Sequence, residues 1–325
     1  MGNRLFAYVT LRAIAKDKGY EFSVLDSDIL ERGASFFSLD NGVKASDDTW
    51  TNIYDERSDR LFIGNSKHDI INGVDVSGTD SDLWNVASGT LIEGILQSED
   101  YFGNYKEDIK EWLKIKPEYD CFEYSKDDLC IINIRGGEYA NSPELFLRRK
   151  YWLDAMKNMR KINPAMHFMT ITDDVNAARR VLPEVEAFHF DVWKDYSIIK
   201  NAKYLIISNS SFAFFPAYTS ETAKMIIAPK YWARHNVSSG YWSCEQNIYD
   251  EFMYQDREGK LFSSEECRKE LERYKANNSS YRLNAPLSGF ALAFSKVRAR
   301  GIKAGDLTIR AFRSLKRRIK HGQNR

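Results

Sequence analysis

Three short polar segments of this sequence each follow an apolar stretch and carry side chains suited to binding a phosphorylated ligand. The first runs from Asn133 to Glu138 and contains Arg135 followed by Gly136 and Gly137. A guanidinium is permanently charged and can bond two phosphate oxygens at once, and glycine lets the backbone approach a ligand closely. A diphosphate is therefore one expected ligand. The alternative is structural, with Arg135 closing the strand end and pairing with Glu138.

The other two segments combine carboxylates and hydroxyls with a predicted helix start. Asp173 and Asp174 follow one apolar stretch, and the run Ser208-Asn209-Ser210-Ser211-Phe212 follows another. A carboxylate in such a place can accept hydrogen bonds from a base or a ribose, and hydroxyls at a helix N-terminus favour phosphate. Both segments also suit helix N-capping, which explains a single serine more easily than a run of four polar residues.

Alternating strands and helices are expected around these segments. The apolar runs 129–134, 167–171, 187–190, 204–207 and 224–228 are typical of short strands, whereas 144–161, 175–182, 196–201 and 212–219 have helical periodicity. This alternation predicts a buried parallel sheet. Because the carboxyl ends of parallel strands meet at one edge, the loops after Ile134, Ile171 and Ile207 should converge on one crevice.

The rest of the chain is less regular. Residues 5–18 have helical spacing and 21–25 suggest a short strand, while 34–90 are rich in Asp, Ser, Asn and Gly with one strand-like piece at 60–63. Residues 245–276 suggest a charged helix. A length of 325 residues with 43% apolar content suits two domains. We place them at 1–124 and 125–285, followed by a basic tail at 286–325.

Seven motifs, in the same order, resemble those of bacterial alpha-1,2-fucosyltransferases of glycosyltransferase family 11. The start from Met1 to Phe6 resembles their GxGN(Q/R)xF motif, Glu93 to Phe102 resembles their QSExYF segment, and the Arg135 loop resembles their HxRRGDY motif. The later YY, SDD, NSxFS and PxxW motifs are similar to Tyr151-Trp152, Thr172-Asp173-Asp174, Asn209-Ser210-Ser211-Phe212 and Pro229-Lys230-Tyr231-Trp232.

This resemblance implies a GT-B fold, in which an acceptor-side and a nucleotide-side Rossmann-like domain face each other across a cleft. It implies inverting transfer of L-fucose from GDP-fucose to a glycan hydroxyl, with neither a metal nor another cofactor. Carried over by position, Arg135 would neutralise the departing diphosphate and Asn3 would face the cleft from the first helix. The remaining donor-site positions would be Asn133, Gly136, Asp174, Asn209 and Phe212, with Ser210 and Ser211 on phosphate and Asp173 on guanine or ribose.

Three departures from the motifs keep other activities open. Asn133 stands where the motif has His, Gly136 replaces its second Arg, and Glu138 replaces its Asp. The same residues could bind another nucleotide sugar. They would also suit a relative that binds nucleotide or glycan without transferring a sugar. The family also has a strand ahead of its Gly-Asn motif, whereas this sequence begins at Met1, so we expect a lost upstream start or a sheet without that edge. A nicotinamide enzyme is disfavoured because no GxGxxG opens a helix after a strand.

Two glutamates are candidate general bases, and two DxD motifs are candidate metal sites. Glu138 and Glu144 lie near the expected crevice, where burial can tune a carboxylate towards neutral pH, although Glu138 also suits pairing with Arg135. Asp26-Ser27-Asp28 and Asp80-Ser81-Asp82 match the DxD pattern of a competing, metal-dependent sugar-transfer fold. Such matches arise easily by chance in an acidic chain, because a metal needs convergent oxygen ligands.

The charge of the chain is strongly asymmetric. Residues 296–325 hold eleven Lys or Arg and one Asp, a net +10 within a total of +1, so the preceding 295 residues carry −9. Leu307, Ala311, Leu315 and Ile319 recur at every fourth position among these cations. This pattern is typical of a basic amphipathic helix at an anionic membrane surface, and packing on the body is the alternative. Nucleic acid is not an expected partner.

The cysteine spacing and the hydropathy of the sequence indicate in which cellular compartment the protein is expected. The four cysteines are widely spaced, no hydrophobic leader opens the chain, and no apolar run approaches the roughly 20 residues that span a bilayer. We expect a cytoplasmic protein, peripheral on the inner face of the cell membrane through its tail. A lipid-linked glycan acceptor, as in surface polysaccharide or O-antigen synthesis, would suit that location.

Overall fold

The computed structural model describes residues 1–25, 33–44, 50–56, 60–62, 74–76 and 78–278. The DxD match at 26–28 and the basic tail at 286–325 lie outside the described residues, so the tail helix stays a prediction. Among the helices that are described, none is long and apolar enough to cross a membrane.

A seven-stranded mixed sheet forms the centre of the C-terminal half and confirms the α/β class. Its strand order is β11-β10-β9-β8-β5-β6-β7, and every neighbouring pair is parallel except β10 and β11. The strands are β5 (Leu129–Ile134), β6 (His167–Thr172), β7 (Ala187–Phe188), β8 (Tyr204–Ile207), β9 (Met225–Pro229), β10 (Met253–Gln255) and β11 (Leu261–Phe262).

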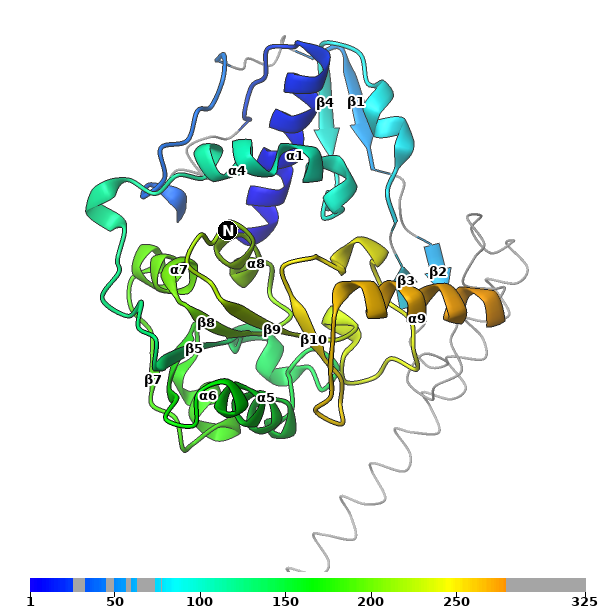
Figure 1. Ribbon diagram of the computed structural model, residues 1–325. Coiled ribbons are helices and arrows are strands. Elements are labelled where there is room, and N and C mark those ends of the chain that lie inside the picture. The colour runs from blue at the N-terminus through cyan, green and yellow to red at the C-terminus, as the bar shows by residue number, and fades with distance from the viewer. Residues whose placement is uncertain (26–32, 45–49, 57–59, 63–73, 77, 279–325) are drawn as a thin grey trace, which may run out of the picture.

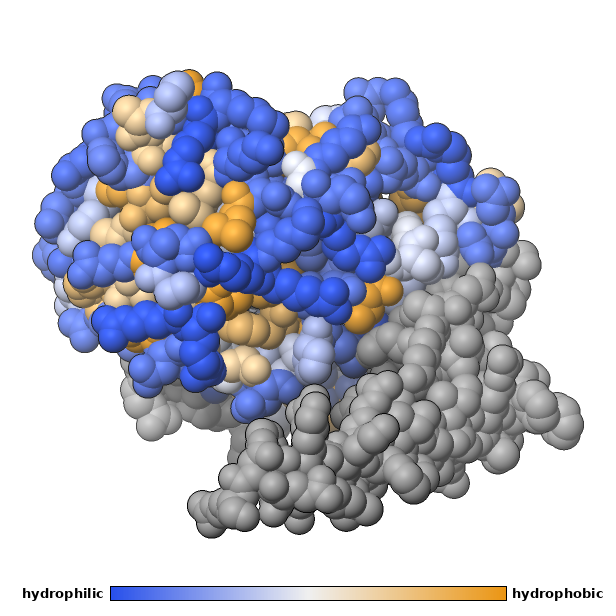
Figure 2. Space-filling model, turned by 90° about the horizontal axis from the view of Figure 1, so that it is seen from below, coloured by the Kyte–Doolittle hydropathy of each residue, from blue (hydrophilic) through white to orange (hydrophobic). Residues whose placement is uncertain are grey.

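Helices cover both faces of this sheet (Figure 1). One face carries α5 (Arg149–Ile162) and α6 (Val175–Val181), and the other carries α7 (Val192–Asn201) and α8 (Ser211–Tyr218). Successive strand residues point to opposite faces, so Ile131 belongs to the apolar cluster of the α7 and α8 face and Ile132 to that of the α5 and α6 face. Viewed from the side of α5 and α6, the surface is largely hydrophilic with smaller apolar areas (Figure 2).

Most of the N-terminal half lies on the α7 and α8 side of the sheet (Figure 1). It contains α1 (Gly2–Lys18), α4 (Lys106–Trp112), the parallel pair β1 (Asn52–Asp55) and β4 (Thr90–Glu93), and the antiparallel pair β2 (Arg60–Phe62) and β3 (Val74–Val76). Short 3-10 helices lie at Ser81–Asn85, Glu99–Tyr101, Gly103–Tyr105, Pro117–Tyr119, Gly137–Asn141, Trp232–Arg234 and Glu245–Asn247, and α9 (Ser264–Asn277) ends the described chain. The two-domain GT-B arrangement and its boundaries stay predictions.

Several predicted elements differ from the structure. Residues 21–25 form no strand, and only one bridge joins Ser23 to Gly42. The helix predicted from residue 144 begins at Arg149, because the side chain of Asn236 binds the carbonyls of residues 143, 144 and 146. The helix predicted from residue 196 begins at Val192. Residues 245–276 are helical only at Glu245–Asn247 and from Ser264, because β10 pairs with β9 and forms a hairpin with β11.

The contact between α1 and α8 joins the two halves. Phe6 stacks on Phe214 with ring centroids 4.8 Å apart and lies 4.7 Å from the ring of Phe215. At the start of α1 the backbones themselves meet, since a Cβ atom added to Gly2 would lie 2.4 Å from the carbonyl atoms of Ser211. Only glycine permits this approach without a shift of one helix.

The exchange Gly2→Ala should therefore push the start of α1 away from α8 and lower the free energy of unfolding by about 1–3 kcal/mol, as overpacking does. Urea denaturation of the purified variant measures this loss. Gly33→Ala is the matched control, because a Cβ at Gly33 has no neighbour within 4 Å. Equal stability of the Gly2→Ala and Gly33→Ala proteins would contradict the close approach.

A second contact between the halves is polar and half-buried. Glu99 accepts a hydrogen bond from the hydroxyl of Tyr218 at 2.9 Å, and Lys106 forms an ion pair with Glu251 beside it. Burial raises the pKa of Glu99 above its ordinary value of 4.5, and this outweighs the effect of the Tyr218 hydroxyl. The folded protein therefore holds the proton of Glu99 more tightly than the unfolded chain does.

The sign of this shift gives a pH-dependent prediction. The contribution of Glu99 to stability is fully present below pH 4.5 and is lost as the pH rises through the higher pKa of the folded state. Glu99→Gln keeps a partner for Tyr218 but does not ionise, so its stability relative to wild type should increase between pH 4 and pH 7. Denaturation at several pH values measures this, with the exposed Glu111→Gln as control. A difference independent of pH would refute the assignment.

Candidate active site

The strand order creates a crevice at the carboxyl ends of β5 and β8. The chain leaves β5 towards β6 and β7 on one side and returns to β8 and β9 on the other, so the connections diverge between β5 and β8. Open α/β sheets bind ligands at such a switch point. Arg135 follows β5 and Ser208 follows β8, and the backbone N–H of Ser208 donates to the carbonyl of Asn133 at 3.1 Å. These two predicted loops therefore meet here, and the third joins them through the ion pair of Asp173 with Arg135.

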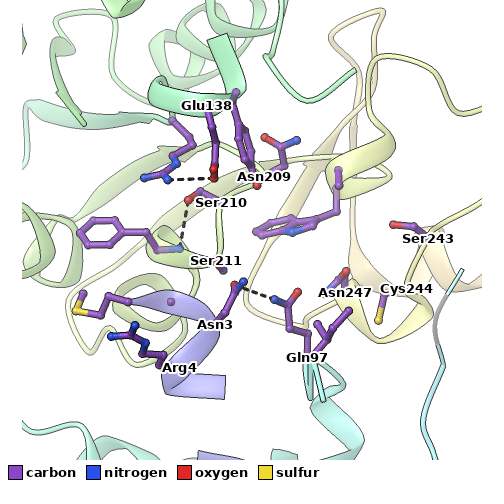
Figure 3. Close-up of a pocket in the computed structure, with 18 residues that line it drawn as sticks. Asn3, Arg4, Gln97, Glu138, Asn209, Ser210, Ser211, Ser243, Cys244 and Asn247 are labelled. Atoms are coloured by element: carbon purple, nitrogen blue, oxygen red, sulfur yellow. Dashed lines mark hydrogen bonds and ion pairs between the residues drawn. The ribbon is translucent and has the colours of Figure 1, made fainter. Parts of the chain in front are cut away.

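A cavity of about 650 Å³ opens at this crevice (Figure 3). Its size falls within the range of pockets that hold small ligands and cofactors. Three regions of the chain contribute to it: the start of α1 with the loop after β4, the loops after β5 and β8, and the segment after β9. The lining residues are Met1, Gly2, Asn3, Arg4, Ile95, Gln97, Arg135, Glu138, Tyr139, Asn209, Ser210, Ser211, Phe212, Trp232, Ala233, Ser243, Cys244 and Asn247.

The guanidinium of Arg135 is held by two carboxylates. Its Nη1 lies 2.8 Å from Oδ2 of Asp173, and its Nη2 lies 3.4 Å from Oε1 of the well-exposed Glu138. Oδ1 of Asp173 also accepts the backbone N–H of Gly136 at 2.7 Å. The predicted pairing with Glu138 is thus present but longer than the one with Asp173. About a third of the Arg135 side chain remains exposed, which leaves guanidinium surface available to a ligand.

The second and third loops both supply helix caps, and the third also forms part of the cavity wall. Asp174 caps α6 by accepting the N–H of Ala177 at 2.9 Å, and Ser210 caps α8 by accepting the N–H of Phe212 at 3.2 Å. The capping alternative therefore holds for both residues. Ser210 and Ser211 also line the cavity, whereas Asp174 does not. This places the N-terminus of α8 beside Arg135, where the positive end of the helix dipole favours an anion.

The structure explains why asparagine stands at position 133 and glycine at position 136. Asn133 is buried, donates to the carbonyl of Ile171 at 3.3 Å and accepts from the hydroxyl of Ser208 at 3.1 Å, so it ties β5 to the neighbouring strand ends. A Cβ at Gly136 would lie 2.5 Å from that of Asp174. A second arginine at this position would therefore displace the start of α6. Neither Asn133 nor Gly136 lines the large cavity.

The N-terminal half closes the opposite wall of the cavity. Oδ1 of Asn3 accepts a hydrogen bond from Nε2 of Gln97 at 3.0 Å, and Arg4 lies one residue further along α1 (Figure 3). Arg4 and Gln97 belong to the motifs quoted above, but a site role was predicted only for Asn3, and Asn247 lies outside the motifs. Arg4 lies on α1 and is brought to the cavity by the packing of α1 against α8, whereas Asn247 lies in the segment after β9. Local periodicity does not reveal either approach. Glu144, the second candidate base, bonds to Arg234 at 2.9 Å and is not part of the lining.

Backbone strain is concentrated around this cavity. Leu96, Tyr231 and Trp232 have positive φ angles of 54°, 68° and 48°, and they are the non-glycine residues of the described chain that do so. Trp232 lines the cavity and Leu96 lies between two residues that line it. Bulky residues in this region of φ cost free energy, and such strain clusters at ligand sites.

The DxD match that the structure describes has a local role. Oδ1 of Asp80 accepts the N–H of Asp82 at 3.1 Å, and its Oδ2 accepts the hydroxyl of Tyr54 at 2.8 Å. Within the described ranges, no three His, Cys, Asp or Glu side chains cluster in a way that would hold a metal ion.

Comparisons with known proteins agree with this geometry. The model of Glycosyl transferase family 11 matches residues 93–256, half of the chain, and this segment contains Gln97, Arg135, Asp173 and Ser210. The alpha-1,2-colitosyltransferase of Escherichia coli is 25% identical over an alignment that covers 47% of this chain and 59% of that relative. The chain thus matches somewhat more than half of the relative's length. On the family match, this chain belongs to glycosyl transferase family 11.

Proposed function

We propose that this protein transfers a sugar from a nucleoside diphosphate donor, GDP-fucose, to a hydroxyl of a glycan. One observation carries the proposal: Arg135, held by Asp173 at the end of β5, lies beside the N-terminus of α8 in the same cavity. A fixed cation beside a helix N-terminus, at a topological switch point, suits a diphosphate. Family membership supports the sugar-transfer chemistry.

The proposed reaction is an inverting displacement. The acceptor oxygen forms a bond to the anomeric carbon as the bond from that carbon to the phosphate oxygen breaks, and the diphosphate leaves with the electron pair. Its growing negative charge would be stabilised by Arg135, Ser210 and Ser211. These side chains already line the cavity before the reaction, so they need little rearrangement. The proton of the acceptor passes to a base or to water, and Glu138 is the carboxylate on the cavity wall. This mechanism assigns no step to a metal ion.

The donor sugar and the acceptor are the finer parts of the proposal. The motif resemblance supports L-fucose, and the name of the Escherichia coli relative adds colitose as the alternative sugar. We place the acceptor on the side of Asn3 and Gln97, because these residues of the N-terminal half line the same cavity as Arg135. That arrangement of two walls supports the GT-B architecture that the motifs imply.

We further propose that the acceptor is lipid-linked and belongs to surface polysaccharide or O-antigen synthesis. The support is the net charge of +10 in residues 296–325, which suits the anionic inner face of the cell membrane.

A binding protein without transfer activity is the second candidate. It is favoured by the replacement of the motif's His and second Arg by Asn133 and Gly136, and by the engagement of Arg135 with two carboxylates. Such a protein would bind GDP but release none from GDP-fucose. Turnover therefore separates the two candidates.

Arg135→Ala should lower the rate of GDP release from GDP-fucose in the presence of acceptor by about 10²-fold or more, because the leaving diphosphate loses its cation. Arg135→Lys should recover only part of this rate, since an ammonium cannot bond two oxygens in a planar fork. Steady-state kinetics measure kcat, and far-UV circular dichroism checks that the variants are folded.

Arg149→Ala is the matched control, because Arg149 pairs with Glu184 away from the cavity lining. It should leave kcat unchanged. A wild-type rate in the Arg135→Ala protein would overturn the role of Arg135, and a wild-type protein that binds GDP without turnover would favour the second candidate.

A further inference from the structure

A second, smaller cavity adjoins the first at the edge of the sheet. Its volume is about 190 Å³, and it shares Met1, Arg135, Ser210 and Phe212 with the larger cavity. It extends from there over the carboxyl ends of β5 and β6 to the start of α7. A ligand whose diphosphate lies at Arg135 can therefore reach into it with one end. Its volume suits a single flat ring system and is smaller than the pockets that enclose whole ligands of this kind.

The far end of this cavity carries a histidine and a buried carboxylate. Nδ1 of His189 lies 2.8 Å from Oδ2 of Asp195, and Oδ1 of Asp195 accepts the backbone N–H of Phe190 at 3.1 Å. The Asp195 side chain is 6% exposed, whereas that of His189 is 46% exposed. Burial raises the pKa of Asp195 to about 6, so at neutral pH it is mostly ionised and acts as an acceptor. Both of its oxygens are used by the protein.

This pairing fixes the hydrogen-bonding character of His189. With Asp195 accepting at Nδ1, the proton of a neutral imidazole resides on Nδ1 and Nε2 is an acceptor. No hydrogen bond from Nε2 to another described residue is present. The far end of the cavity therefore presents Nε2 of His189 as an acceptor, because the oxygens of Asp195 already bind His189 and the backbone N–H of Phe190.

The walls between these polar groups are apolar and one is aromatic. Ile134, Ile171, Val192 and Phe212 line the cavity. Flat apolar walls, an aromatic ring and a few fixed polar groups are the features that bind a nucleobase, since every base has a face that stacks and an edge that hydrogen-bonds.

We infer that the His189–Asp195 pair selects the nucleobase of the donor, with Nε2 of His189 accepting an N–H from the edge of the base and Asp195 positioning the imidazole. The inference rests on the proposed function, because it takes the diphosphate to lie at Arg135. Guanine suits an acceptor at this place, since its edge presents a ring N–H next to an amino group. His189 would then supply an imidazole in a chain where Asn133 stands in place of the motif's His.

Isothermal titration calorimetry of the full-length protein with GDP, UDP and pyrophosphate tests this inference. Wild type should prefer GDP to UDP. His189→Ala should weaken GDP binding about tenfold or more, lower the preference for GDP over UDP, and leave the affinity for pyrophosphate unchanged. His167→Ala is the matched control, because His167 lies exposed at the amino end of β6, at the opposite edge of the sheet. It should change none of the three affinities.

The possible results distinguish a failure of this inference from a failure of the proposed sugar-transfer function. If His189→Ala weakens GDP and pyrophosphate equally, or weakens neither, His189 does not select the base, and the proposed function stands as long as wild type binds GDP. If wild type binds pyrophosphate but no nucleoside diphosphate, both the inference and the nucleotide donor are refuted. Asp195→Asn should also reduce the preference for GDP over UDP, and an unchanged preference would refute its positioning role.

Discussion

The ion pair between Arg135 and Asp173 joins the end of β5 to the loop after β6 and holds a cation at the point where the sheet connections diverge. Asp173 also binds the N–H of Gly136, so one carboxylate fixes both the side chain and the backbone of the loop. Both partners are roughly 30% exposed, which makes the pair a positioning device more than a source of stability. A cation held in this way needs little reorganisation when a diphosphate binds or leaves.

The opposite wall depends on apolar packing. The rings of Phe6, Phe214 and Phe215 bring α1 onto α8, and the absence of a side chain at Gly2 lets the two helix starts meet. Asn3 and Gln97 reach the cavity only because of this contact. Stability and site geometry are thus coupled, and damage to the aromatic contact would separate the side that binds diphosphate from the side that we assign to the acceptor.

Much of the C-terminal half could be predicted from sequence, and the reasons are physical. Almost wholly apolar runs predicted β5 and β8 with their observed bounds, because strands buried on both faces have few polar positions, here Asn133. The start of α5 was wrong because a distant side chain, Asn236, binds the carbonyls of the first predicted turn. The pairing of Arg135 with Asp173, the approach of Gln97 to Asn3 and the cavity at His189 all depend on tertiary contacts, which local periodicity does not encode.

The central claim is that Arg135 and the N-terminus of α8 hold a nucleoside diphosphate without a bridging metal ion. Crystallising the protein with GDP in excess EDTA would test it most directly. We predict density for the diphosphate within hydrogen-bond distance of the Arg135 guanidinium and of the backbone N–H groups at Ser210 and Ser211. A diphosphate bound elsewhere, or one that appears only when Mn²⁺ or Mg²⁺ is supplied, would contradict the account.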